Sequence, residues 1–98
     1  MHVGGFDWDS GNWPKCGKHG VSREEIEAVF HSAETIYLDD KVHSRSERRW
    51  LAISKTVPGH HGLLVGFTFR QRDGRSLIRP ISARFMHRKE VGQYGEDR

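Results

Sequence analysis

Residues 63–84 read LLVGFTFRQRDGRSLIRPISAR, and this stretch decides the fold. Two segments rich in β-branched and aromatic residues, 63–69 and 76–83, flank the pair Asp73-Gly74. An Asp-Gly pair between two such segments is a strong signal for a tight β-hairpin turn. The stretch therefore predicts two antiparallel strands that are joined directly.

Further features place this hairpin in a larger sheet. The nearly continuous apolar run over 63–67 predicts a central strand that is covered on both faces. Pro80 has no backbone N–H, so we expect its strand to lie at a sheet edge or to contain a bulge. Segments 35–38 and 49–54 have the same residue types, and the turn-forming residues 58–62 precede the hairpin. The sequence thus predicts a four-stranded, or slightly larger, antiparallel sheet.

One helix is predicted to begin directly after Ser22. Ser22 and Glu25 have the spacing of a capping box, in which each side chain accepts a hydrogen bond from the other residue's backbone N–H. Val21 precedes the cap as one half of a hydrophobic staple. Apolar residues then recur with helical spacing at Ile26, Val29, Phe30 and Ala33.

Shorter elements are expected before this helix and after the last strand. Residues 6–9 read as a short strand or extended segment, and residues 10–19 as a brief helix that is weakened by Gly11, Pro14 and Gly17. A final helix is expected over about 86–94. Helices at both ends of an antiparallel sheet make this an α+β domain.

Length and composition limit the class of protein. With 98 residues the chain can build one hydrophobic core, so we expect a single domain over 1–98. No apolar run reaches the roughly 20 residues that a membrane span needs. The single Cys16 can form neither an internal disulfide nor a paired zinc motif. We therefore expect a cytoplasmic protein that uses no cofactor or metal.

Charge is distributed unevenly along the chain. Residues 1–40 hold three Lys and Arg against eight Asp and Glu, whereas residues 41–98 hold thirteen against five. The most basic segment, 70–89, has seven cationic side chains and one carboxylate, Asp73. Such a segment attracts phosphates through Coulomb attraction and counterion release. Charge alone leaves three alternatives: nucleic acid, an acidic protein partner and a solvated surface.

Short blocks of sequence in a fixed order resemble one protein family. The blocks are Phe6-Asp7-Trp8-Asp9, Lys18-His19-Gly20-Val21-Ser22 with Glu24-Glu25, Val29-Phe30, His43-Ser44 with Glu47-Arg48-Arg49-Trp50, and Arg79 with Ile81-Ser82-Ala83-Arg84, Glu90 and Tyr94. Together they span nearly the whole chain and resemble the BrnT toxins. These belong to the small RelE-like ribonuclease toxins of bacterial toxin–antitoxin pairs.

The resemblance implies a RelE-like fold, in which helices pack against a curved antiparallel sheet. It implies an endoribonuclease that cuts RNA without a metal and stops translation. It also implies a cognate antitoxin, usually a ribbon-helix-helix DNA-binding protein, so that this chain meets DNA only indirectly within a hetero-oligomer. Because residues 70–89 are basic, we expect the antitoxin to cover that surface with acidic or apolar groups.

Metal-free RNA cleavage requires a base for the 2′-hydroxyl, an acid for the leaving 5′-oxygen and cations for the charge on phosphorus. Arg70 ends the most apolar strand, where it either holds a phosphate or simply caps the strand. Glu47, flanked by arginines, is a base, an orienting partner for arginine or a plain salt bridge. His43 and His19 are acid–base candidates because histidine titrates near neutrality. The predicted catalytic set is Glu47, Arg70, Arg84 and His43.

Other cations are candidates for phosphate contacts. Lys18 lies just before a helix N-terminus, a location that favours anions. Simple alternation places Arg84 with Ile78 and Arg79 on the opposite side of the strand, so the two arginines share a site only if Pro80 introduces a bulge. The predicted phosphate-binding set is Lys18, Arg48, Arg49, Arg79 and Arg88.

A second interpretation belongs to another class of function. The chain would then be a non-catalytic nucleic-acid or protein interaction module that keeps the same fold. Pro80 in a strand that carries arginines and the Pro and Gly residues of 10–17 favour this alternative. Substitution of Arg70 or Glu47 separates the two, because only a toxin has growth arrest to lose.

Overall fold

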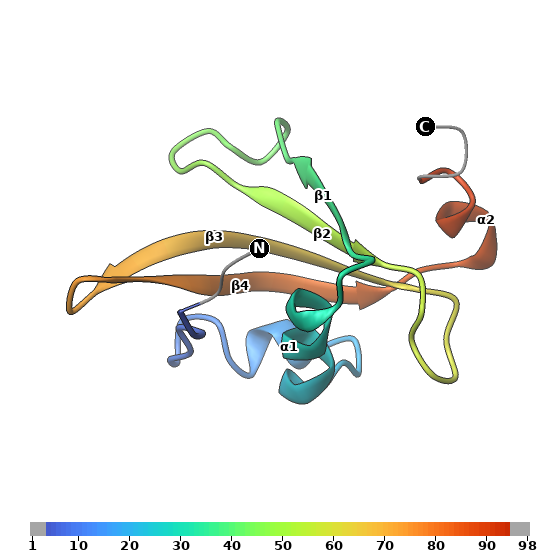
Figure 1. The fold of residues 1–98 in the computed structure, drawn as a ribbon, viewed down its shortest axis with the longest axis horizontal. Coiled ribbons are helices and arrows are strands. Elements are labelled where there is room, and N and C mark those ends of the chain that lie inside the picture. Colours follow the sequence, from blue (N-terminus) through green and yellow to red (C-terminus); the bar gives the residue numbers. More distant parts are fainter. Residues whose placement is uncertain (1–3, 95–98) are drawn as a thin grey trace.

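The computed structural model describes residues 4–94, which form an open four-stranded antiparallel sheet with helices (Figure 1). The strands are β1 (Ile36–Asp39), β2 (Trp50–Ser54), β3 (Leu63–Arg72) and β4 (Arg75–Phe85). They lie in the order β1-β2-β3-β4, so each strand pairs with its neighbour in sequence. The predicted α+β class and all four predicted strands are confirmed, and β3 and β4 are longer than predicted.

The helix α1 (Arg23–His31) begins as the sequence predicts. The Ser22 hydroxyl accepts a hydrogen bond from the Glu25 N–H at 3.0 Å, and the Glu25 carboxylate accepts one from the Ser22 N–H at 2.9 Å. The helix lies against one face of the sheet (Figure 1), where the Phe30 ring meets that of Phe67 edge-on at 4.9 Å between centroids. The buried residues of the helix are Ile26, Val29 and Phe30.

The opposite face of the sheet is less completely covered. Cross-strand pairing places Leu38, Leu51 and Leu64 on this face, and all three side chains are only partly buried. The prediction that the first hairpin strand is covered on both faces is therefore wrong at Leu64, although β3 is central in the strand order. The helix α1 packs on the Phe67 face (Figure 1), and a single helix covers only the face on which it lies.

The hairpin between β3 and β4 has the predicted tight turn. Asp73 has a φ of 50° and Gly74 a φ of 76°, as a two-residue type I′ turn requires. The turn therefore fixes the register at which the two strands start to pair.

A β-bulge interrupts this register in β4. Gly66 pairs with Ser82, whereas the next residue, Phe67, pairs with Pro80, so Ile81 is the extra residue. Pro80 thus lies next to a bulge in the last strand of the order, which confirms the expectation drawn from its missing N–H. Because the bulge offsets the alternation of side chains, it changes which residues share a face.

The arginines of β4 illustrate this change. Arg79 pairs with Thr68 and Arg84 pairs with Leu64, two β3 residues whose side chains point to the same face. Arg79 and Arg84 therefore share a face, as expected if a bulge lies at Pro80, and simple alternation does not hold across the bulge. Ile78 instead points into the core beneath α1, where it is 1% exposed.

The N-terminal segment lies along the outer edge of β4. The Asp7 N–H donates a hydrogen bond to the Ile78 carbonyl at 2.8 Å, which confirms an extended segment here. The Asn12 side-chain amide then donates to the Pro80 carbonyl at 2.8 Å. The brief helix predicted within 10–19 is the single 3₁₀ turn η1 (Lys15–Gly17), which this hydrogen bond holds beside the bulge.

The C-terminal helix α2 (Arg88–Val91) is shorter than the predicted 86–94. It ends at Gly92, a residue with low helix propensity. None of the helices within residues 4–94 is long and apolar enough to cross a membrane.

Candidate active site: a basic cleft along β4

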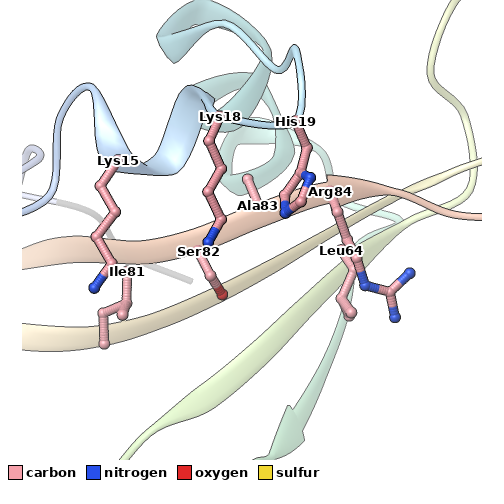
Figure 2. Close-up of a pocket in the computed structure, with 8 residues that line it drawn as sticks. All are labelled: Lys15, Lys18, His19, Leu64, Ile81, Ser82, Ala83 and Arg84. Atoms are coloured by element: carbon pink, nitrogen blue, oxygen red, sulfur yellow. The ribbon is translucent and has the colours of Figure 1, made fainter.

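Two adjoining cavities lie between η1, β4 and the β1–β2 loop, and we call them together the basic cleft. Lys15, Ile81 and Ser82 line both cavities. The first, of about 240 Å³, is further lined by Lys18, His19, Leu64, Ala83 and Arg84 (Figure 2). The second, of about 230 Å³, is further lined by Asp40, His43, Arg49 and Gly66.

Two lysines reach into the cleft from above β4. Lys15 and Lys18 are three residues apart across η1, and side chains at this spacing lie on the same side of a 3₁₀ turn. Figure 2 shows both side chains extending from that segment toward Ile81 and Ser82. His19 follows in the same segment, so one short turn supplies three of the basic groups of the cleft.

The floor of the cleft is formed at the bulge. Because Ile81 is the extra residue, Ile81 and Ser82 both line the cleft although they are adjacent in sequence. Gly66 lies across from Ser82, and a Cβ on Gly66 would stand 2.7 Å from the Ser82 hydroxyl oxygen. Only glycine therefore leaves this part of the floor in its present shape.

Arg84 closes the first cavity and is paired with a carboxylate. Its guanidinium donates two hydrogen bonds to the Glu90 carboxylate of α2, at 2.9 and 2.6 Å. These hydrogen bonds hold the pKa of Glu90 below its usual value. Arg84 is still 44% exposed at its side chain, so the positive charge reaches the cleft but is partly compensated.

The second cavity combines an imidazole, a carboxylate and a guanidinium. The His43 Nδ1 lies 3.0 Å from the Asp40 carboxylate. The Ser44 hydroxyl donates to the Asp40 carbonyl at 2.6 Å and accepts a hydrogen bond from the Arg49 N–H at 2.9 Å. The β1–β2 loop is thereby closed on itself. The Arg49 Nε is buried and has no hydrogen-bond partner among the described residues.

Glu47 and Arg70 form an ion pair with each other, and their side chains are each 34% exposed. Neither lines the basic cleft. Arg70 lies four residues from Gly66 along β3, a separation of about 13 Å at the usual rise of a strand. The pair ties the β1–β2 loop to β3, as does the hydrogen bond from the Thr68 hydroxyl to the Arg48 carbonyl at 2.7 Å.

The other predicted phosphate ligands also lie outside the cleft lining. Arg79 is 13% exposed at its side chain and donates hydrogen bonds to Asp7 and Asp9 at 2.9 to 3.1 Å. Burial alone would raise the pKa of Asp7, but hydrogen bonds from Arg72 and Arg79 outweigh it and hold that pKa below its usual value. Arg48 pairs with Asp39 at 2.9 Å, and Arg88 is exposed on α2.

The structure thus gathers part of the predicted site and adds residues that sequence reasoning missed. Of the predicted residues, the cleft is lined by Lys18, His19, His43, Arg49 and Arg84. The residues that were missed are Lys15, Asp40, Gly66 and Ser82. The three-residue spacing of Lys15 and Lys18 in a helical turn and the spacing of Asp40 before His43 were the available signals. Burial raises the pKa of the Cys16 thiol, in agreement with an unreactive cysteine.

Comparison with known proteins assigns the family. No curated protein matches the chain significantly. The sequence model of a family described as the ribonuclease toxin BrnT of type II toxin–antitoxin systems matches residues 8–90, a range that includes every residue lining the basic cleft. The chain therefore belongs to the BrnT family of ribonuclease toxins of type II toxin–antitoxin systems.

Proposed function

We propose that this protein is a metal-independent endoribonuclease with a RelE-like fold, that it binds RNA in the basic cleft, and that it stops translation in the cytoplasm by cutting mRNA. The observation that carries the proposal is the convergence of Lys15, Lys18, Arg49 and Arg84 on one hollow beside two histidines. Family membership supports the reaction class.

The side chains of the cleft suit phosphate chemistry. An RNA backbone brings one negative charge per nucleotide, and lysine and arginine neutralise it by direct contact and counterion release. During cleavage, further negative charge develops on the phosphoryl oxygens, and fixed cations stabilise that charge strongly where water is restricted. Ammonium and guanidinium groups supply these positive charges from the chain itself.

We further propose that a cognate antitoxin of the ribbon-helix-helix class covers the cleft, so that DNA is met only through the antitoxin. The partly exposed Leu38, Leu51 and Leu64 lie on the same face of the sheet as the cleft. A segment with apolar and acidic side chains would fit both surfaces at once. Hydrogen exchange of the complex should show protection along β4 and the β1–β2 loop. Protection confined to residues 1–40 would contradict this arrangement.

The ribonuclease proposal is tested with a charge-matched pair of double variants. Lys18→Ala/Arg84→Ala removes two cations from the cleft, whereas Lys55→Ala/Arg75→Ala removes two cations from outside it. After tightly controlled induction, the wild type and the Lys55/Arg75 variant should arrest growth and degrade RNA, and the Lys18/Arg84 variant should not.

Purified protein then tests the mechanism directly. Cleavage of RNA should continue in excess EDTA, and a cell-free translation reaction should stop when the wild type is added. RNA that is bound but stays intact would favour the non-catalytic interaction module. Loss of cleavage in EDTA that Mg²⁺ restores would overturn metal independence.

A further inference from the structure

We propose that the second cavity is the reacting end of the cleft, with His43 as the general base, Arg49 as the cation at the scissile phosphate and Asp40 as the residue that positions His43. This inference rests on the proposed ribonuclease function. It assigns the chemistry to Asp40, His43 and Arg49 rather than to the Glu47–Arg70 pair.

The Asp40–His43 pair has the arrangement that a histidine base requires. The Asp40 side chain is 11% exposed, and its carboxylate lies 3.0 and 3.2 Å from the His43 Nδ1. A carboxylate in this position accepts the Nδ1–H and fixes the tautomer in which Nε2 carries the lone pair. Nε2 is then the nitrogen left to take a proton, on a ring that lines the second cavity.

No other described histidine has this arrangement. Only His43 has a side-chain carboxylate within hydrogen-bond distance of its ring in the part of the chain that the structure covers. His60 instead stacks on the Phe85 ring at 3.6 Å between centroids. His19 lines the first cavity without a carboxylate partner among the described residues.

Arg49 differs in its surroundings from four other arginines of the sheet and its loops. Arg48, Arg70, Arg79 and Arg84 each donate to a carboxylate, which compensates their charge. Arg49 has no such partner among residues 4–94, and its buried Nε has no hydrogen-bond acceptor there. Because the Nε has no exposed surface, an acceptor from outside the chain would reach the guanidinium through its two Nη groups, on the side chain that lines the second cavity. A phosphate oxygen has the charge and the geometry for it.

The backbone holds Arg49 in place independently of its side chain. Its N–H donates to the Ser44 hydroxyl at 2.9 Å, and its carbonyl accepts a hydrogen bond from the Asp40 N–H at 3.0 Å. The same short loop therefore fixes the base, the positioning carboxylate and the cation relative to one another. Preorganisation of this kind is what stabilises a charged transition state.

The reaction that follows is balanced without a co-reactant other than water. His43 Nε2 takes the proton of the ribose 2′-hydroxyl, and the 2′-oxygen forms a bond to the adjacent phosphorus. The bond from phosphorus to the 5′-oxygen breaks, and that oxygen takes a proton from water in the open cleft. Arg49 contacts the phosphoryl oxygens throughout. The products are a 2′,3′-cyclic phosphate and a 5′-hydroxyl, and His43 returns its proton to solvent.

The test uses the full chain and a short RNA that carries a cut site mapped for the wild type. Single-turnover cleavage is measured with saturating protein, and affinity is measured with the same RNA carrying a 2′-deoxyribose at the cut site. His43→Ala should lower the cleavage rate about 10²–10⁴-fold, the range for a lost general base, with affinity changed less than about threefold. Added imidazole should restore part of this activity.

The companion variants separate the roles. Asp40→Asn keeps a hydrogen-bond acceptor but removes the charge, so cleavage should fall at least tenfold with affinity unchanged. Arg49→Ala should lower both rate and affinity and should not respond to imidazole. Arg45→Ala, which removes a cation of the same loop from outside the cleft, is the matched control and should behave as the wild type.

Each outcome is decisive. If the wild type and His43→Ala cut equally fast, or if imidazole leaves His43→Ala unchanged, the assignment of His43 is overturned while the ribonuclease function stands. If the wild type does not cut RNA at all, the proposed function fails and this inference fails with it.

Discussion

The Ser82 hydroxyl oxygen lies 2.7 Å from the point at which a Cβ on Gly66 would stand. The two residues are cross-strand partners at the bulge, and both line the basic cleft. Because of this close approach, the cleft floor keeps its present shape only when residue 66 is glycine.

Gly66→Ala is therefore expected to rotate the exposed Ser82 side chain away from residue 66 and to lower the free energy of unfolding by less than about 1 kcal/mol. Ser82→Ala removes the clashing oxygen, so the double variant should be nearly as stable as Ser82→Ala alone. Urea unfolding of all four proteins gives the coupling directly. If the stability effects of Gly66→Ala and Ser82→Ala were strictly additive, contact with the Ser82 hydroxyl would not be what makes a larger residue 66 unfavourable.

Removal of the carboxylate that compensates Arg84 should strengthen RNA binding. Glu90→Gln leaves the shape of the side chain but releases the Arg84 charge, so affinity for an uncleavable RNA should rise about three- to tenfold at low salt. Arg84→Ala should weaken affinity by a similar factor. Both effects should shrink as salt is raised, because phosphate contacts are screened. Unchanged affinity in Glu90→Gln would place Arg84 outside the RNA site.

The Glu47–Arg70 pair is expected to act on activity through the β1–β2 loop. Half-exposed ion pairs contribute at most about 1 kcal/mol, so Glu47→Ala and Arg70→Ala should stay folded. Cleavage should nevertheless fall about tenfold, because His43 and Arg49 lie on the loop that the pair anchors. The double variant should lose no more than either single variant. Hydrogen exchange should quicken over 40–49, whereas Arg45→Ala should leave it unchanged.

Asp7 should make stability depend on pH in the acid range. Its folded pKa is held below the ordinary value by Arg72 and Arg79, so its contribution is full above about pH 4 and is lost as pH falls further. The melting temperature of the wild type should therefore drop below about pH 4. Asp7→Asn should be less stable at pH 7 by roughly 1–3 kcal/mol and should show a weaker acid dependence. If the melting temperatures of the wild type and Asp7→Asn fell equally steeply as pH decreased, this role for Asp7 would be ruled out.

Much of the fold could be predicted from local sequence signals. The Ser22–Glu25 capping box, the Asp73-Gly74 turn and the consequence of Pro80 each depend on residues that are close together in the chain. Local sequence rules are reliable for these features because the groups that interact lie only a few residues apart in the chain. The sequence could not show which carboxylate each arginine meets.

The candidate site depended on contacts between distant parts of the chain. Arg79 is neutralised by Asp7 and Asp9, some 70 positions earlier, and the side of β4 that Arg79 occupies depends on where the extra residue of the bulge is inserted. The number of candidate partners grows with chain length, whereas spacing rules reach only a few residues. Asp40 was missed for a simpler reason, since a carboxylate in a polar loop is ordinary until the fold shows what it contacts.

The extra residue, Ile81, divides β4 into one half next to the hairpin turn and a second half next to α2. The tight turn sets the pairing of 75–80, and the buried Ala83 helps to set the pairing beyond the bulge. Deletion of Ile81 would keep the turn but remove the offset between the two halves of β4. The side chains of one half, either residues 75–80 or residues 82–85, would then have to move to the opposite face of the sheet. Homologues that lack this residue should therefore present the side chains of one half of β4 on the opposite face of the sheet. A designer who introduces new specificity into the cleft should keep the length of β4 unchanged.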